Sequence, residues 1–239
     1  MQNNTQTLKI YGDKISQPVR SVLLFCELNK IPYNFIPINI LKGEQHTNEE
    51  LQKVNPSKKM PAISYSDNTG KTFNLAESCS ILRFLSEIYK VDEKWYPRND
   101  IYRRSLIDQH MDWHHSNTRH IFSGAIVKKM MVPKMLKLGG EFAEKAKLFV
   151  DTSSQIPILL KKFDEIFSER KFIVDDQISI ADLIFSCEVY QIKILGYDLT
   201  QYPNLWKYLC RINETPEAMK INDTLEKLDA SLKKRNAKF

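Results

Sequence analysis

Features of secreted and membrane-bound proteins are missing from this 239-residue sequence. The four cysteines, Cys26, Cys79, Cys187 and Cys210, lie far apart and form no C-x-x-C pair. Each falls in an apolar run, so we expect buried, reduced thiols, as in a reducing compartment. The polar N-terminal hexapeptide has no signal-peptide pattern, and no apolar run approaches the roughly 18 residues of a membrane span. We therefore expect a cytoplasmic protein with no membrane partner.

Glycine is also scarce, and the basic residues form no single stripe. Only seven glycines and many amphipathic runs favour a helix-rich protein. Lysine and arginine outnumber aspartate and glutamate by 35 to 29, which gives a net charge of +6 and a pI near 9.0. This surplus is scattered in pairs such as Lys128-Lys129 and Lys161-Lys162. A scattered surplus favours a solvated surface, so we expect no nucleic-acid partner.

The first part of the chain alternates strand and helix patterns. One helix opens at Ile15–Pro18, where proline is tolerated in the first turn, and a short helix is expected within Lys42–Gln52. A third helix carries the i, i+3, i+4, i+7 pattern of Ile81, Phe84, Leu85 and Ile88. Strands are expected at Leu8–Tyr11, Tyr33–Ile38, Ala62–Tyr65 and Thr72–Leu75. The right-handed crossover rule makes the first two strands parallel, and a tight turn makes the last two antiparallel.

The second part of the chain has no convincing strand pattern. It follows a linker-like segment, Val91–Asn99, and begins with a long helical run over Asp100–Met131 that breaks near Val132-Pro133. Gly139-Gly140 turns the chain toward a helix whose buried face comprises Ile156, Leu159, Leu160, Phe163 and Phe167. Ser179 and Asp182 have the spacing of a capping box at the start of another buried helix. Shorter helices are expected around Leu205–Ile212 and Pro216–Leu232.

The segment Asn55–Ser80 joins several features that suit a ligand site. Pro61 precedes a strand, and a cis Met60–Pro61 bond would turn the backbone polar groups of Met60 toward a ligand. Ser78 stands at a helix N-terminus, where free N–H groups bind anions. Together with the lysines before Met60, these features could hold a small, anionic, peptide-like molecule. An ordinary hairpin capped by a helix explains the same residues equally well.

The order of elements resembles that of the cytosolic glutathione S-transferases, and short motifs resemble their theta class. The motifs are Ile15–Arg20, Asn55–Ile63, Glu77-Ser78, Trp95–Pro97, Asp112–Arg119 and Ile178–Asp182. The matches extend from about Leu8 to Trp206, which is most of the chain. The resemblance implies a thioredoxin-like α/β domain that binds glutathione (1–89), a linker (90–100) and an all-α domain that carries the electrophile pocket (101–239).

By this resemblance, the N-terminal domain would hold glutathione along its whole length. Lys59 would reach the glycine carboxylate together with Gln45 or His46, and Met60 would pair by its backbone with the cysteinyl unit. The segment Gly43–His46 is one residue longer than usual in the theta class, so the choice between Gln45 and His46 stays open.

The resemblance also implies which residues bind the γ-glutamyl end of glutathione, including one that acts across a dimer. Glu77 and Ser78 would take the γ-glutamyl group, with Ser78 and the helix N-terminus at its carboxylate. Asp108 would reach the γ-glutamyl amine bound by the partner subunit of a homodimer.

The family chemistry has a physical basis that can be checked against single residues. A thiol with a pKa near about 8.5 is mostly protonated at neutral pH, whereas the thiolate is the nucleophile. A hydroxyl that donates to sulfur near a helix N-terminus favours the thiolate. The residues alone favour a plain helix N-cap for Ser16, whereas the resemblance gives it this role. Tyr11 is the alternative donor, and Arg119 would face the electrophile pocket or stay solvated.

The sequence thus indicates a transferase that joins glutathione to small electrophiles such as alkyl halides, epoxides or peroxides, as in detoxification. The alternative is a non-catalytic ligand carrier or interaction module of the same fold. The intact set of Ser16, Lys59, Glu77 and Ser78 favours the enzyme. His110 and His114 share a helix face, but no cysteine or H-E-x-x-H pattern accompanies them, so no metal cofactor is expected.

Overall fold

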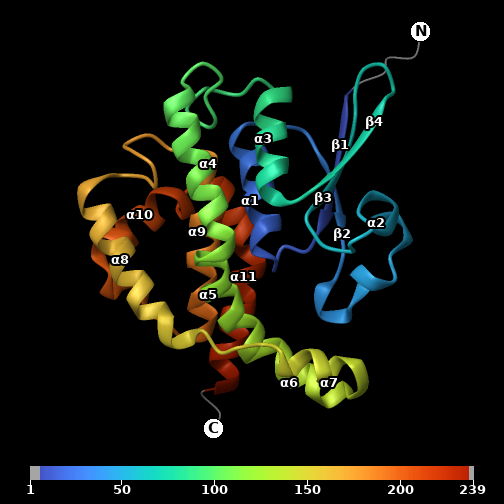
Figure 1. The fold of residues 1–239 in the computed structure, drawn as a ribbon, viewed down its shortest axis with the longest axis vertical. Coiled ribbons are helices and arrows are strands. Elements are labelled where there is room, and N and C mark those ends of the chain that lie inside the picture. Colours follow the sequence, from blue (N-terminus) through green and yellow to red (C-terminus); the bar gives the residue numbers. More distant parts are fainter. Residues whose placement is uncertain (1–5, 237–239) are drawn as a thin grey trace.

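A four-stranded sheet and three helices form the first part of the protein, and helices alone form the rest (Figure 1). The computed structural model describes residues 6–236. The sheet order is β2-β1-β3-β4, with β1 parallel to β2 and the other neighbours antiparallel. Both predicted strand directions are therefore confirmed. The strands are β1 (Thr7–Gly12), β2 (Asn34–Pro37), β3 (Ala62–Ser66) and β4 (Thr72–Ala76).

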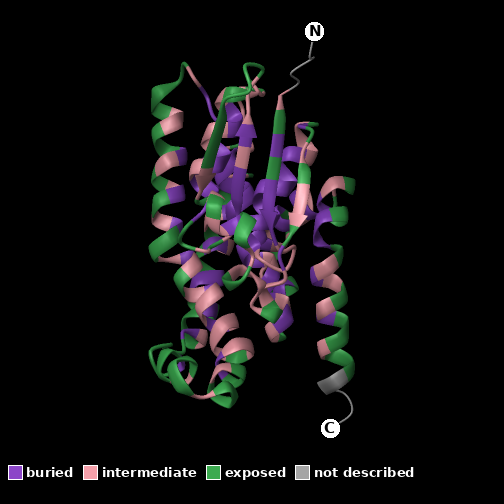
Figure 2. Cartoon of the chain, turned by 90° about the vertical axis from the view of Figure 1, so that its right-hand side faces the viewer, coloured by how far each residue is buried: buried purple, intermediate pink, exposed green. Residues whose placement is uncertain are grey.

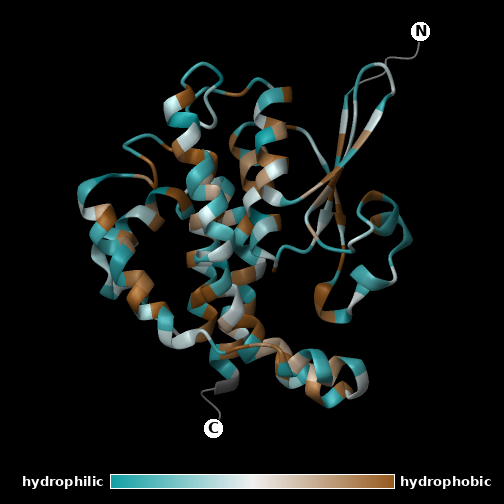
Figure 3. Cartoon of the chain, in the orientation of Figure 1, coloured by the Kyte–Doolittle hydropathy of each residue, from teal (hydrophilic) through white to brown (hydrophobic). Residues whose placement is uncertain are grey.

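Helices cover both faces of this sheet. The helices α1 (Gln17–Leu28) and α3 (Ser78–Ile88) contact each other and share the main core with inward residues of β1 and β3. The helix α2 (Glu49–Val54) packs on the opposite face, where Leu51 meets Tyr11 and Ala62. Two 3₁₀ turns, η1 (Ile40–Lys42) and η2 (Glu44–His46), lead into α2. In Figure 3 the hydrophobic colouring gathers at the middle of the sheet, where the strands cross.

Every strand in the described part of the chain lies before residue 77, as the sequence predicts. The second part contains the main helices α4 (Ile101–Ser116), α5 (Thr118–Ile126), α6 (Val132–Leu138), α7 (Gly140–Lys147), α8 (Ile156–Glu169), α9 (Ile180–Tyr190), α10 (Pro203–Asn213) and α11 (Pro216–Asn236). Shorter turns are η3 (Val127–Met131, a π-helix), η4 (Ser153–Gln155), η5 (Gln191–Leu195) and η6 (Leu199–Gln201). None of the described helices combines the length and apolar composition needed to cross a bilayer.

The first long helical run has a break that the sequence did not predict. The helix α4 ends at Ser116, and Asn117, with a φ of −118° and a ψ of −80°, separates it from α5. Near Val132-Pro133, where a break was expected, the π-helix η3 ends and α6 begins, with Pro133 in its first turn. The bend at Asn117 matters because it turns the residues on either side of it toward the first domain.

The buried helix α9 is the centre of the molecule and contacts α1, α4, α5 and α10. Its N-terminus has the predicted capping box between Ser179 and Asp182. The fully buried Asp182 carboxylate accepts from Ser179 N at 2.8 Å, Ser179 Oγ at 2.9 Å and Ile173 N at 2.7 Å. Figure 2 shows the buried residues concentrated between the sheet and the outer helices.

Two burial predictions need correction. Cys26, Cys79 and Cys187 are buried free thiols, but Cys210 is only partly buried. Ile88 belongs to the predicted apolar face of α3 and yet is 39% exposed, because it ends the helix at the surface. The predicted face of α8 is confirmed, since all five of its residues are buried.

Candidate functional site

Residues from both parts of the chain line a cavity of about 180 Å³. The sheet side supplies the loop before β3 and the start of α3, whereas the helical side supplies the residues flanking the Asn117 bend. The lining residues are Pro18, Asn55, Lys59, Met60, Pro61, Glu77, Ser78, His115 and Arg119. Five of the predicted site residues, Lys59, Met60, Glu77, Ser78 and Arg119, therefore meet around one space.

The loop before β3 is shaped by Asn55, which begins the predicted ligand segment but was not predicted to contact the ligand. Its Nδ2 donates to the carbonyl of Lys59 at 2.8 Å, and its Oδ1 accepts from Ser57 N at 3.2 Å and Ser57 Oγ at 2.9 Å. An asparagine before Pro-Ser is a turn-forming signal that could have identified it. Met60 lies outside the β3–β4 register, and the Met60–Pro61 bond is cis. The backbone polar groups of Met60 therefore do not belong to the sheet.

The start of α3 forms the adjoining wall. Glu77 has a φ of 67° and a ψ of 113°, a conformation that non-glycine residues rarely adopt. Strained backbone of this kind is concentrated at functional sites. Ser78 is the first residue of α3 and is 5% exposed. The N–H groups of this first turn have no partner within the helix, so the wall offers an electropositive surface beside the exposed Glu77 carboxylate.

Arg119 forms the wall opposite, on α5. Its Nη1 donates to Gln17 Oε1 at 2.8 Å, and the same atom lies 3.4 Å from Glu188 Oε2 on α9. Gln17 directly follows Ser16 and donates from Nε2 to the carbonyl of Ile184 at 2.8 Å. The guanidinium of Arg119 is thus fixed between α1 and α9 while it lines the cavity.

The neighbouring histidines His114 and His115 on α4 have different surroundings. His115 lines the cavity, and its Nε2 is 3.3 Å from Cys79 Sγ. Burial raises the pKa of the Cys79 thiol to about 11, which disfavours the nucleophilic thiolate at neutral pH. His114 points into the core, where burial, with the Arg119 and His115 charges, lowers its pKa to about 3. His114 is therefore neutral in the folded protein at physiological pH.

The two candidate donors to sulfur have different surroundings. Ser16 is the N-cap residue of α1, yet its side chain makes no capping hydrogen bond. Tyr11 is 1% exposed, and its hydroxyl donates to Glu50 Oε1 at 2.6 Å on the α2 face of the sheet. Burial and this hydrogen bond raise the pKa of Tyr11. Neither residue lines the cavity, but Pro18, two residues after Ser16, does.

Besides Ser16, three predicted site residues lie outside the cavity lining. Gln45 and His46 lie on η2; the Gln45 Oε1 atom is buried without a partner in the described chain, and His46 is exposed. Asp108 on α4 accepts from Arg83 Nε at 2.7 Å and from the Tyr96 hydroxyl at 3.0 Å. The predicted roles of all three stay predictions.

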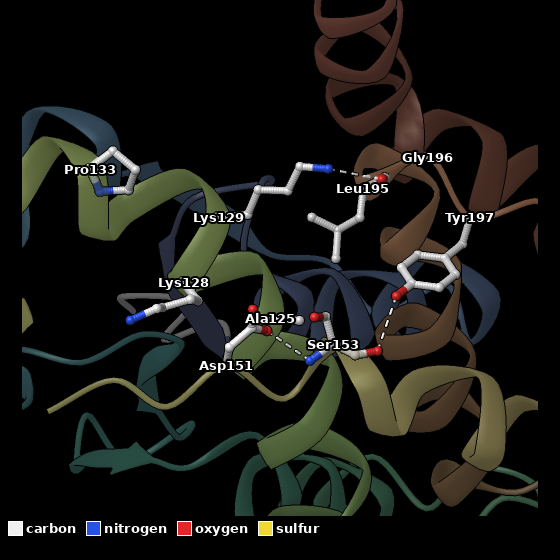
Figure 4. Close-up of a pocket in the computed structure, with 9 residues that line it drawn as sticks. All are labelled: Ala125, Lys128, Lys129, Pro133, Asp151, Ser153, Leu195, Gly196 and Tyr197. Carbon is white, nitrogen blue, oxygen red and sulfur yellow. Dashed lines mark hydrogen bonds between the residues drawn. The ribbon is translucent and has the colours of Figure 1, made fainter. Parts of the chain in front are cut away.

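A second cavity, of about 520 Å³, lies elsewhere among the helices (Figure 4). None of the predicted site residues lines it. The ammonium groups of its two lysines already donate to carbonyls, Lys128 to Phe149 and Lys129 to Leu195, and Tyr197 donates to the carbonyl of Ser153. We therefore take the smaller cavity, with its convergent charged groups, as the candidate site.

Comparisons with known proteins show which family the chain belongs to. The family described as "Glutathione S-transferase, N-terminal domain" matches residues 16–88, and "Glutathione S-transferase, C-terminal domain" matches residues 122–216. A mouse protein, glutathione S-transferase theta-3, is 35% identical over 182 residues, which are 76% of this chain and 71% of that protein. The chain belongs to the glutathione S-transferase family. Human glutathione S-transferase theta-1, another theta-class relative, is 34% identical over 76% of this chain and 72% of its own length.

Solved structures of the glutathione S-transferase family share the fold. The apo form of human glutathione S-transferase T1-1 has a TM-score of 0.75 at 26% identity and covers 93% of this chain and 91% of its own. Human glutathione transferase theta-2, in complex with glutathione and an unknown ligand, has a TM-score of 0.76 at 25% identity and covers 95% and 91%. The N-terminal domain is thus thioredoxin-like, and the C-terminal domain is helical, as the sequence predicts.

The buried, neutral His114 predicts a pH-dependent stability. Its pKa is lowered from 6.5 to about 3, so between these values the unfolded chain binds a proton that the folded protein does not. Stability from this residue is present above pH 6.5 and is lost as pH falls toward about 3. As pH falls between these values, we expect the free energy of unfolding of wild type to drop by up to about 1.4 kcal/mol per pH unit relative to that of His114→Gln. Urea titrations at several pH values measure both. A difference between the two proteins that is independent of pH would contradict this assignment.

Proposed function

We propose that this protein is a glutathione transferase of the theta type, in which glutathione occupies the cavity between the start of α3 and α5. The observation that carries the proposal is the convergence of Lys59, Met60, Glu77, Ser78 and Arg119 on one space. The proposal includes the predicted division of the chain into a glutathione-binding domain (1–89), a linker (90–100) and a helical domain (101–239).

The charges around the cavity suit glutathione, a tripeptide with two carboxylates and one ammonium group. Lys59 and the N-terminus of α3 at Ser78 supply positive potential at two places, and Glu77 supplies one negative charge. In this proposal Lys59 binds the glycine carboxylate with help from Gln45 or His46. Ser78 holds the γ-glutamyl carboxylate, Glu77 approaches the γ-glutamyl amine, and Met60 pairs through its backbone with the cysteinyl unit.

Thiolate formation is assigned to Ser16. Its hydroxyl makes no capping bond, so it is available to donate to sulfur at the positive end of α1. The hydroxyl of Tyr11, by contrast, is committed to Glu50 at 2.6 Å. Lowering a thiol pKa by about two units requires about 2.7 kcal/mol of selective thiolate stabilisation, which one hydrogen bond and a helix terminus together can supply.

Arg119 would act on the electrophile side of the same cavity. Only its Nη1 has hydrogen-bond partners in the described chain, so the rest of its guanidinium can face negative charge that forms on sulfur or on a leaving group. The thiolate would attack a small electrophile such as an alkyl halide, an epoxide or a peroxide. With a halide, a C–S bond forms as the carbon–halogen bond breaks, and halide leaves with the bonding electron pair.

A homodimer is part of the proposal, with Asp108 directed to glutathione in the partner subunit. The α4 surface supports it, because Ile101, Tyr102 and Leu106 are 62%, 84% and 47% exposed. Exposed apolar side chains grouped on one helix are typical of a surface that another protein covers.

A turnover assay with glutathione and a panel of alkyl halides, epoxides and peroxides tests the function. Conjugation of glutathione or reduction of a peroxide would support a transferase. Saturable glutathione binding without turnover on any member of the panel would favour the alternative, a ligand carrier. Absence of glutathione binding would contradict both and leave an interaction module.

Lys59→Met is expected to weaken glutathione binding about fivefold and to leave turnover at saturating glutathione unchanged. An exposed lysine–carboxylate contact contributes about 1 kcal/mol, and it is the same in the ground state and the transition state. Lys58→Met is the matched control, because it removes the same charge from a neighbouring residue that does not line the cavity. Isothermal titration calorimetry measures both affinities, and equal losses in the two variants would refute a specific contact.

A further inference from the structure

Glu188 on α9 is a buried carboxylate that the proposed chemistry leaves without a role. Its side chain has 0% exposure, which is rare for a glutamate unless it is paired. Ser123 Oγ and Gln191 Nε2 each donate to its Oε1 at 2.6 Å. Its Oε2 lies 3.4 Å from Arg119 Nη1 and 3.7 Å from His114 Nε2.

Arg119 is the cation in contact with this carboxylate. His114 does not provide a positive charge, because burial keeps it neutral. Arg20 on α1, which donates to the carbonyl of the preceding residue, Cys187, attracts the Glu188 carboxylate more weakly than Arg119 does. Burial raises the pKa of Glu188, whereas the charges of Arg119 and Arg20 and the two hydrogen bonds lower it. Glu188 therefore depends on Arg119 for charge compensation, and Arg119 has one buried carboxylate in reach.

The same turn of α9 also holds the segment around Ser16. Gln17 donates to the carbonyl of Ile184 at 2.8 Å. Arg20 donates from Nη2 to the carbonyl of Cys187 at 3.1 Å and from Nη1 to that of Ile15, just before Ser16, at 2.6 Å. Gln17 and Arg119 are joined directly at 2.8 Å. One turn of α9, from Ile184 to Glu188, thus contacts both the segment around Ser16 and Arg119, on the two sides of the candidate reaction centre.

We propose that Glu188 is a positioning residue that holds the Arg119 guanidinium in the cavity wall at a fixed distance from the Ser16 turn. This inference rests on the proposed function, since it assigns Arg119 to negative charge that forms during the reaction. Glu188 itself touches no substrate. Its charge attracts Nη1 of Arg119, which also donates to Gln17, so that the remaining guanidinium nitrogens are oriented toward the cavity.

A double-mutant cycle on turnover tests this role. Glu188→Gln keeps the size of the side chain and removes its charge, and we expect kcat to fall about fivefold with little change in the glutathione concentration for half-saturation. The double variant with Arg119→Met is expected to be no slower than Arg119→Met alone. Losses that multiply would show that Glu188 acts independently of Arg119 and would overturn the proposal.

Two further variants separate positioning from a general effect on folding. Glu188→Asp keeps the charge and should retain more of kcat than Glu188→Gln. Glu226→Gln is a control for loss of a paired carboxylate outside the cavity lining, because Glu226 pairs with Lys193 at 2.7 Å and should leave kcat unchanged. If Glu188→Gln does not fold, Ser123→Ala removes one of its hydrogen bonds and should give a smaller loss in the same cycle.

A crystal structure of Glu188→Gln gives a readout that does not need turnover. We expect the Arg119 guanidinium to leave Gln17 Oε1 in this variant. If wild type has no activity on any electrophile, the proposed function fails. A displaced Arg119 in the structure of Glu188→Gln would still support the positioning role. An Arg119 that keeps its place in the variant would overturn that role even in an active enzyme.

Discussion

Ser16→Ala is expected to lower turnover at least about tenfold and to leave glutathione affinity largely unchanged. A hydroxyl that donates to sulfur stabilises the thiolate and the transition state, whereas the rest of the tripeptide is held by other residues. In free solution at neutral pH, a thiol with a pKa near about 8.5 is only a few per cent ionised. Loss of the donor should therefore also raise the pH at which turnover reaches half its maximum.

Tyr11→Phe is the matched comparison, because it removes the other candidate hydroxyl. Its donation to Glu50 predicts no change in turnover. The rate constant at saturating glutathione, measured over a range of pH, distinguishes the two residues. A large loss in Tyr11→Phe with an active Ser16→Ala would reverse the assignment. Weaker binding with unchanged turnover in Ser16→Ala would make Ser16 a binding residue only.

Asp182→Ala is expected to lower the free energy of unfolding by about 3–5 kcal/mol. Its carboxylate accepts three hydrogen bonds, from Ser179 N, Ser179 Oγ and Ile173 N, at a fully buried position. Alanine leaves these donors without an acceptor, and buried unsatisfied groups are costly. Because α9 also contacts Gln17, Arg20 and Arg119, reduced activity should accompany reduced stability.

Asp164→Ala is a matched control for this substitution. Asp164 on α8 accepts from Asn204 N at 2.7 Å and Leu205 N at 2.9 Å, and so caps α10, but it is only partly buried. Water can replace the lost acceptor there, so the expected cost is about 1 kcal/mol. Urea denaturation of both variants measures the difference. Equal losses would show that the burial of Asp182 is not what makes it important.

Local patterns predicted most of the fold. Proline in a first turn, the capping box and the apolar face of α8 each depend on neighbours within a few residues. The break at Asn117 was missed because asparagine and threonine interrupt helices weakly, whereas Pro133 looked like an obvious break. A proline, however, is compatible with the start of a new helix, and the sequence alone does not say which helix a proline begins.

The candidate site was predicted less completely, because it depends on contacts between distant residues. The motif residues Lys59, Met60, Glu77, Ser78 and Arg119 do meet at one cavity. Nothing in the local sequence shows that Tyr11 donates to Glu50, 39 positions away, or that Arg119 contacts Glu188, 69 positions away. Asn55 and His115 lie in motifs of the family resemblance but were given no site role, because an Asx turn and an exposed histidine are common on any surface.

The contacts of α1 with α9 have a consequence for how the two halves of the chain depend on each other. Arg20 is completely buried, and one of its two terminal nitrogens uses a carbonyl of the helical half. Gln17 does the same through Ile184. An N-terminal half separated from the rest would expose this cation and its apolar neighbours without replacing their partners. We therefore expect the two halves to unfold together, as one cooperative unit.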